Sequence, residues 1–176
     1  DGESGRDHRR VACAISTRVE RKASDPRRRR RNPRVRSKRI LTGQRFQMVL
    51  DSSAVVAIIK GEPGWEELAR KVSDADAILI GAPTLVEIAM VLSGQTGKDQ
   101  RFRLEAFLQR IEARVVEFSY RHYLLAEEAF LRFGRGFHSK ANLNFGDCMS
   151  YAVATLADDT LLFVGDDFVH TDVRQA

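Results

Sequence analysis

The sequence holds few of the residues that build disulfide-linked, zinc-binding or membrane-spanning proteins. Only two of its 176 residues are cysteines and only four are histidines. Two cysteines cannot make a disulfide framework, which favours a reducing, cytoplasmic compartment. The histidines show no zinc-site spacing, and no apolar run approaches the roughly 18–20 residues of a membrane span. Hydrophobic residues make up 43% of the chain, so the composition predicts one globular domain with no membrane segment.

Charge divides the chain into two parts. Residues 1–47 hold 16 Lys/Arg against 5 Asp/Glu, a net charge of +11, whereas residues 48–176 hold 13 against 19, a net charge of −6. The first part has five consecutive arginines, Arg27 to Arg31, and few apolar residues, so we predict a disordered basic leader. It is either a nucleic-acid-binding arm or a segment outside the natural functional protein. We favour the second interpretation, with the true start at Met48, because an apolar strand begins abruptly there.

After the leader, short apolar runs alternate with helical patterns. A helix is expected directly after the first run, and further helices fill the intervals between the other runs. This alternation predicts an α/β fold with a central parallel sheet and helices on both faces. The runs predicted to be buried strands are residues 48–50, 77–81, 115–118 and 160–164, and the later helices are expected at 65–73, 83–93, 101–113, 120–132 and 148–157.

Acidic residues occupy positions in these elements where acids are uncommon. Asp51 directly follows the first strand, and Asp166 and Asp167 follow the last, so a parallel sheet brings them to one edge. Glu87 lies among apolar residues of a helix, and Asp147 opens a helix of small residues. Acids are rare in such surroundings unless they are paired or bind a metal. The pattern therefore predicts a cluster of carboxylates at the carboxyl edge of the sheet.

Each acid also has a purely structural explanation. Asp51 and Asp147 fit helix N-caps, Asp166 or Asp167 fits the cap of a turn, and Glu87 fits an outward-facing helix position. These explanations would have to hold in four separate elements at once. Converging carboxylates without a nearby Lys or Arg repel one another unless a cation lies among them. Oxygen ligands favour Mg²⁺ or Mn²⁺ over zinc, and such a site can activate water and hold phosphate oxygens.

Four segments of the chain, in this order and spacing, resemble those of PIN-domain ribonucleases, specifically the VapC toxins of bacterial toxin–antitoxin pairs. The resemblance covers residues 48–173 and leaves the leader outside. It implies that residues 48–176 form a PIN-like nuclease domain, a three-layer α/β sandwich around a parallel sheet of four to five strands. The matching segments are Met48 to Ala54, Pro83 to Glu87, Leu143 to Ala152, and Leu161 to Phe168 followed by Thr171-Asp172-Val173.

The resemblance also implies an activity, a cofactor and partners. Members cleave structured RNA, commonly transfer or ribosomal RNA, with Mg²⁺, form homodimers, and are neutralised by an antitoxin that docks near the acidic site. Carried onto this sequence, Asp51 and Asp147 are the principal metal ligands, and Glu87 and a final acid complete the cluster. Asp166 and Asp167 both fit the final position, and we predict Asp166.

Two other functions stay open from the residues alone. A non-catalytic protein would bind nucleic acid through the basic leader and use the acids only as caps. A DNA nuclease or a phosphatase would use the same metal site on another substrate. Dehalogenase-type phosphatases are disfavoured because Ser53 stands where they need a second Asp. Arg135 and Lys140, in the loop before Asp147, are either phosphate contacts or part of a solvated loop.

Overall fold

The computed structural model describes residues 47–137 and 140–176. The predicted leader, apart from Gln47, lies outside the described residues. All pairings within the sheet are parallel, and the strand order is β3-β2-β1-β4. The first strand therefore lies inside the sheet, beside the last one. The strands are β1 (Gln47–Leu50), β2 (Ala77–Gly81), β3 (Arg114–Val116) and β4 (Thr160–Leu162).

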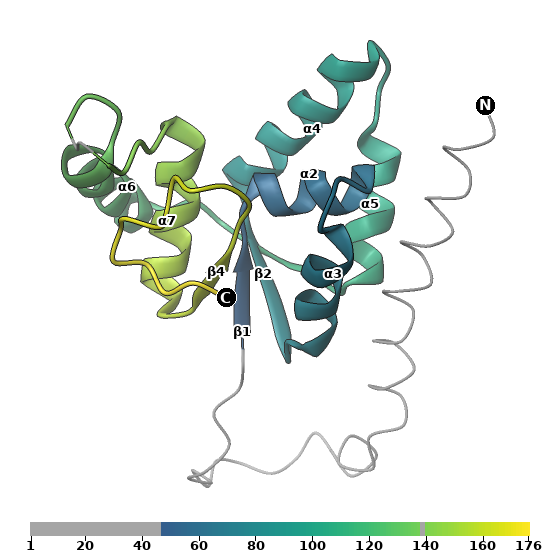
Figure 1. The fold of residues 1–176 in the computed structure, drawn as a ribbon, viewed down its shortest axis with the longest axis horizontal. Coiled ribbons are helices and arrows are strands. Elements are labelled where there is room, and N and C mark those ends of the chain that lie inside the picture. Colours follow the sequence, from purple (N-terminus) through teal and green to yellow (C-terminus); the bar gives the residue numbers. More distant parts are fainter. Residues whose placement is uncertain (1–46, 138–139) are drawn as a thin grey trace, which may run out of the picture.

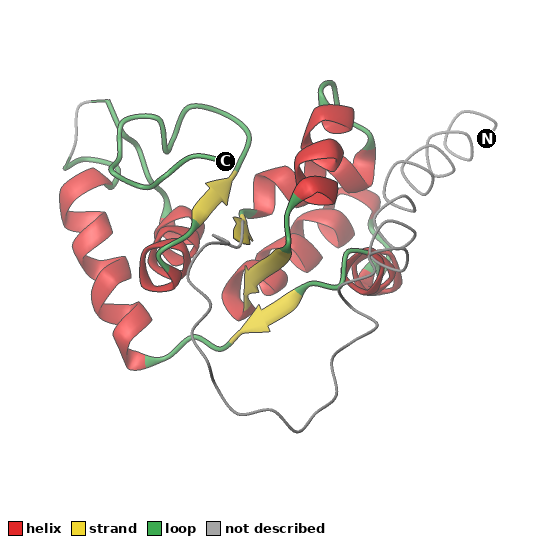
Figure 2. Ribbon diagram, turned by 90° about the horizontal axis from the view of Figure 1, so that it is seen from below, coloured by secondary structure: helices red, strands yellow, loops and turns green. Residues whose placement is uncertain are grey.

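Helices cover both faces of this sheet (Figures 1 and 2). One face packs against the four helices between β1 and β3, and the other packs against the two helices between β3 and β4. The α/β fold class and the three-layer arrangement predicted from the sequence are thereby confirmed. The helices are α2 (Ser52–Lys60), α3 (Trp65–Asp74), α4 (Ala82–Thr96), α5 (Arg101–Arg110), α6 (Tyr120–Phe133) and α7 (Phe145–Ala157).

Alternate residues of the inner strand divide the core into two clusters. Met48 and Leu50 face α2 to α5, whereas Val49 faces α6 and α7, and all three are fully buried. A strand that is buried on both faces reads as a continuous apolar run rather than an alternating one. The acid that directly follows this run is therefore delivered from the centre of the molecule to the edge of the sheet.

Three predicted boundaries are wrong, and the first two affect the acids. β4 ends at Leu162 rather than at residue 164, so Asp166 and Asp167 lie in a loop beyond the strand. α7 begins at Phe145, which places Asp147 inside its first turn rather than ahead of the helix. α4 continues through Gly94 and ends at Thr96, before a left-handed Gly97 with φ of 63°. Within the described residues, no helix is both long enough and apolar enough to cross a membrane.

Candidate active site

Asp51 joins β1 to α2 and is only 2% exposed. It is the N-cap of α2, as its structural explanation predicted: its Oδ2 accepts the Ser53 backbone N–H at 2.9 Å and the Ser53 hydroxyl at 2.6 Å. Its Oδ1 is buried and has no hydrogen-bond partner among the described residues. Capping therefore occupies one oxygen and leaves the other desolvated and unpaired, which is costly unless something else binds it.

Ser53 connects this carboxylate to the loop that follows β4. Its Oγ donates to Asp51 Oδ2 and accepts the Val164 backbone N–H at 2.9 Å. Two residues before Val164, the Leu162 carbonyl accepts the Asp51 backbone N–H at 2.9 Å. The Ser53 side chain thus continues the hydrogen bonding between the two segments beyond the end of the β1–β4 pairing. It holds the loop that carries Asp166 and Asp167 against the first turn of α2.

Asp147 is buried in the first turn of α7, with 7% exposure. The N-cap of this helix is Asn144, not Asp147. The Asn144 Oδ1 accepts the Asp147 backbone N–H at 3.0 Å, and the Asp147 Oδ2 accepts the Asn144 backbone N–H at 2.7 Å. This reciprocal pair is a capping box, which orients the carboxylate rigidly.

The surroundings of Asp147 disfavour its negative charge. Its pKa is raised to about 6: burial is the largest cause, the Asn144 hydrogen bond opposes it, and the charges of Asp51, Asp167 and Glu87 add to it. No lysine or arginine of the described residues is among these influences. The structure therefore brings together acids from the end of β1, from α4, from α7 and from the loop after β4.

Glu87 projects from α4 toward the first turn of α7. Its Oε2 is buried and has no hydrogen-bond partner among the described residues. Burial raises the pKa of Glu87, a hydrogen bond from Ser52 lowers it, and the charge of Asp51 raises it. The carboxylate lies directly against Gly146. The outward-facing position that a surface helix would give it is therefore not the one observed.

The fourth acid lies in the loop after β4. The chain turns there at Gly165, with φ of 98°, and the Asp166 carbonyl accepts the Val169 backbone N–H at 3.1 Å. The side chains of Asp166 and Asp167 are both exposed. Of these two acids, Asp167 is the one whose charge raises the pKa of Asp147. Electrostatics thus favour Asp167 over the predicted Asp166, and the assignment of the fourth acid stays a prediction.

The donor set suits a hard divalent cation. The unpaired buried oxygens of Asp51 and Glu87, together with the mutual repulsion of the acids, are what a cation would relieve. Among the described residues, no group of three or more His, Cys, Asp or Glu side chains is placed to hold a metal ion together. Mg²⁺ rarely needs one, because it keeps several waters and binds through one or two carboxylates. The two predicted ligands, Asp51 and Asp147, fit this arrangement.

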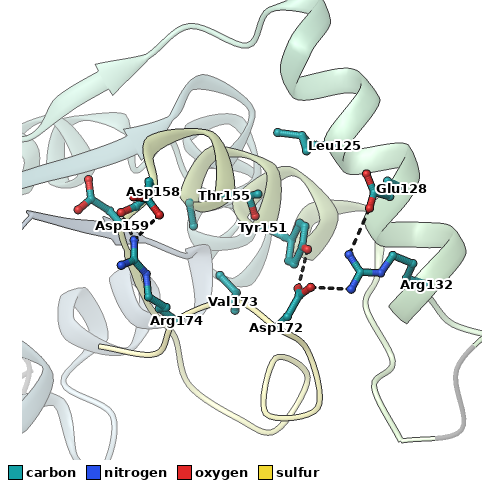
Figure 3. A pocket seen from close by; sticks show the side chains of 11 residues that line it. Leu125, Glu128, Arg132, Tyr151, Thr155, Asp158, Asp159, Asp172, Val173 and Arg174 are labelled. Carbon is teal, nitrogen blue, oxygen red and sulfur yellow. Dashed lines mark hydrogen bonds and ion pairs between the residues drawn. The ribbon is translucent and has the colours of Figure 1, made fainter.

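A second group of polar residues, away from the acidic site, includes the paired acid Asp172 (Figure 3). It lines a cavity of about 260 Å³ formed by α6, α7 and the C-terminal segment. Asp172 accepts the Tyr151 hydroxyl at 2.6 Å and Arg132 at 2.5 Å. Burial alone would raise the pKa of Asp172, but these hydrogen bonds lower it. Asp172 therefore links the C-terminal segment to α6 and α7, and Arg132 and Tyr151 are its partners.

Sequence reasoning missed the residues that hold the acids in place. Asn144 stands three residues before Asp147, which is the capping-box spacing and could have been recognised. Ser53 stood out in the sequence only because dehalogenase-type phosphatases need an Asp at its position, and its link to Val164 joins positions 111 residues apart. Nothing local in the sequence marks that contact.

The three-layer fold around a parallel sheet defines an α/β protein. Carboxylates that converge at the carboxyl edge of that sheet form an acidic site of the kind that binds metal ions. Residues 48–174 match the model of the PIN domain. VapC36 ribonuclease of Mycobacterium tuberculosis is 41% identical over 128 residues, which cover 72% of this chain and 91% of the relative. VapC28 ribonuclease of the same species is 36% identical over 129 residues, covering 73% and 97%.

Solved structures share the fold at low sequence identity. VapC20 of Mycobacterium tuberculosis, titled a sarcin–ricin loop cleaving toxin, superposes with a TM-score of 0.57 at 19% identity, over 73% of this chain and 98% of that one. VapBC2 of Rickettsia felis, bound to a promoter DNA fragment, superposes with a TM-score of 0.58 at 18% identity, over 74% of this chain and 96% of that one. The chain belongs to the PIN-domain family, among the VapC ribonucleases.

Proposed function

We propose that this protein is a metal-dependent endoribonuclease that hydrolyses RNA phosphodiester bonds and acts as the toxin of a toxin–antitoxin pair. One observation carries the catalytic part of the proposal. The charges of Asp51, Glu87 and Asp167 converge on a buried Asp147 and help raise its pKa to about 6. A fold that only needed helix caps would have no reason to gather them.

Within this site the acids have two roles, binding the metal ion and handling water. Asp51 and Asp147 are the direct ligands of Mg²⁺ or Mn²⁺, because each is buried and is fixed by hydrogen bonds to one oxygen. The bound ion supplies Lewis acidity to a phosphoryl oxygen and to water. Glu87 and the acid of the 166–167 loop would orient a water molecule and accept its proton.

The RNA substrate has to approach an acidic body. The cation offsets part of the negative charge, and the loop before α7 offers Arg135 and Lys140, both exposed. Their position next to the Asn144 cap supports a contact with substrate phosphates. Transfer or ribosomal RNA is the substrate class that the family resemblance implies, and the cytoplasm is the corresponding location.

The partners belong to the same proposal: a cognate antitoxin and a second copy of this chain. VapBC complexes among the structural neighbours support the antitoxin. Exposed aromatic side chains around α6 support a protein contact, since Tyr120 is 72% and Phe145 is 78% exposed. A groove of about 410 Å³ lies between α6 and α7, lined by Tyr123, Ala126, Glu127, Phe130, Phe145, Cys148 and Met149.

The test is cleavage of total RNA by the full-length protein with Mg²⁺, with EDTA, and by the Asp51→Asn and Asp147→Asn variants. We expect cleavage in Mg²⁺ only, and a loss of about 100-fold or more in each variant, because each removes a charged metal ligand. Circular dichroism confirms that the variants are folded. Cleavage that persists in EDTA, or in both variants, would reject the proposal.

The same assay separates the two alternatives. If the leader were the functional part, RNA binding would vanish when residues 1–47 are deleted, and magnesium would change nothing. A DNA nuclease or phosphatase would instead cut single-stranded DNA or a phosphomonoester in competition with RNA. We expect RNA to be cut in preference to both.

A further inference from the structure

We propose that Gly146 is a positioning residue whose missing side chain creates the space in which the Glu87 carboxylate lies. This inference rests on the proposed function, because it concerns the geometry of the same acidic site. Gly146 is the second residue of α7 and directly precedes Asp147. It is therefore part of the turn that presents a metal ligand, and it touches no substrate itself.

The evidence is the close approach between Glu87 and this glycine. A Cβ atom built on Gly146 would lie 2.4 Å from Glu87 Oε2, 2.5 Å from Oε1 and 2.7 Å from Cδ. All three distances are well below the van der Waals contact of about 3.5–4.0 Å. The whole carboxylate thus lies across the position that any other amino acid would fill.

Backbone conformation does not explain the glycine. Gly146 lies in regular helix and is not among the glycines with positive φ, such as Gly61 or Gly165. In helical backbone alanine is preferred to glycine by about 1 kcal/mol, so helix formation alone would favour a side chain at this position. Space is the remaining reason: the glycine lets α4 bring its carboxylate against the first turn of α7.

The same contact indicates which atoms a side chain at position 146 would displace. The atoms nearest to the added Cβ are the far end of a flexible side chain, not backbone. A methyl group at this position would therefore push the Glu87 carboxylate out of the site rather than distort α7. Glu87 Oε2 is buried without a partner, so no hydrogen bond holds that oxygen in place against the displacement.

The test is Gly146→Ala in the full-length protein, alone and combined with Glu87→Gln. Gly94→Ala is the matched control, because Gly94 is also helical and a Cβ there would meet nothing within 4 Å. The readouts are the Tm of the metal-free protein, Mn²⁺ affinity by calorimetry, and the rate of RNA cleavage.

We expect Gly146→Ala to leave Tm unchanged or to raise it by up to about 4 °C, as Gly94→Ala does. Mn²⁺ affinity should fall about 10- to 100-fold and the cleavage rate about 100-fold, close to the losses in Glu87→Gln. In the Glu87→Gln background, Gly146→Ala should add little further loss, since the two changes act through one carboxylate.

The outcomes separate this inference from the proposed function. Wild-type affinity and cleavage in Gly146→Ala, beside a defective Glu87→Gln, would overturn the role of Gly146 and leave the function standing. Fully additive losses in the double variant would overturn it too, as would a Tm drop that accounts for the lost activity. A wild-type protein without metal-dependent cleavage would reject the function and this inference with it.

Discussion

At the scale of one residue, the buried charge of Asp147 lowers the stability of the metal-free protein at neutral pH. Folding raises the pKa of Asp147 from 3.8 to about 6, chiefly by burial. The folded state therefore binds the proton more tightly than the unfolded chain. This stabilising contribution is complete below about pH 4 and is lost as the pH rises through about 6. At neutral pH the metal-free protein holds a buried charge that its neighbours repel.

Asp147→Asn should accordingly stabilise the metal-free protein at pH 7.5. The amide carries no charge, and its oxygen still accepts the Asn144 N–H. We expect a gain in the free energy of unfolding of about 1–2 kcal/mol at pH 7.5 that disappears toward pH 4. Urea unfolding in EDTA at several pH values measures it. A pH-independent difference between the two proteins would show that the charge of Asp147 is not the cause.

At the scale of elements, the site depends on contacts between segments far apart in the chain. Ser53, in the first turn of α2, joins the Asp51 carboxylate to the loop after β4. The capping box of Asn144 and Asp147 does the corresponding work at the start of α7. Helix starts therefore supply the rigidity that loops lack, which metal ligands require for correct orientation.

Ser53→Ala removes the link between α2 and the β4 loop while keeping the helix. We expect Mn²⁺ affinity and the cleavage rate to fall about 10- to 100-fold, with a loss of stability of only about 1 kcal/mol. Ser53→Thr retains the hydroxyl and should retain most of the activity. Ser73→Ala, on α3, is the control for a helical serine. Wild-type metal affinity in Ser53→Ala would show that Asp51 needs no such support.

At the scale of the whole molecule, the sheet order determines which acids can meet. β1 lies between β2 and β4, so Asp51 is flanked by the segments that follow both neighbours. α4, which directly follows β2, carries Glu87, and the loop after β4 carries Asp166 and Asp167. α7, packed on the opposite face, adds Asp147. The two helical layers thus meet at the carboxyl edge, with negative charge on both sides.

A divalent cation should therefore stabilise the whole fold. Mn²⁺ at about 100 times its dissociation constant adds about 2.7 kcal/mol, which corresponds to a rise in Tm of about 5–10 °C for a domain of this size. Thermal unfolding followed by circular dichroism, with and without Mn²⁺, measures the shift. The Asp51→Asn, Asp147→Asn double variant should show none. An equal shift in that variant would place the cation elsewhere.

The amino-acid sequence by itself determined the elements and the candidate acids. Apolar runs and helical periodicity predicted a strand or helix close to each of those observed, and Asp51, Glu87 and Asp147 stood out because acids are rare in such surroundings. These features are local, since each depends on neighbours within a few residues. The end of β4 was predicted wrongly because Phe163 and Val164 continue the apolar run, although hydrogen bonding to the neighbouring strand has already ended.

Only the tertiary structure decided how the acids are held and which of them act on one another. The contact of Glu87 with Gly146, the bridge from Ser53 to Val164, and the influence of Asp167 on Asp147 all join separate segments. Their physical basis is close packing and desolvation, which arise only when the layers come together. A pattern of residues can therefore identify a candidate carboxylate. The pKa of that carboxylate, and whether one of its oxygens lacks a hydrogen-bond partner, depend on the folded chain.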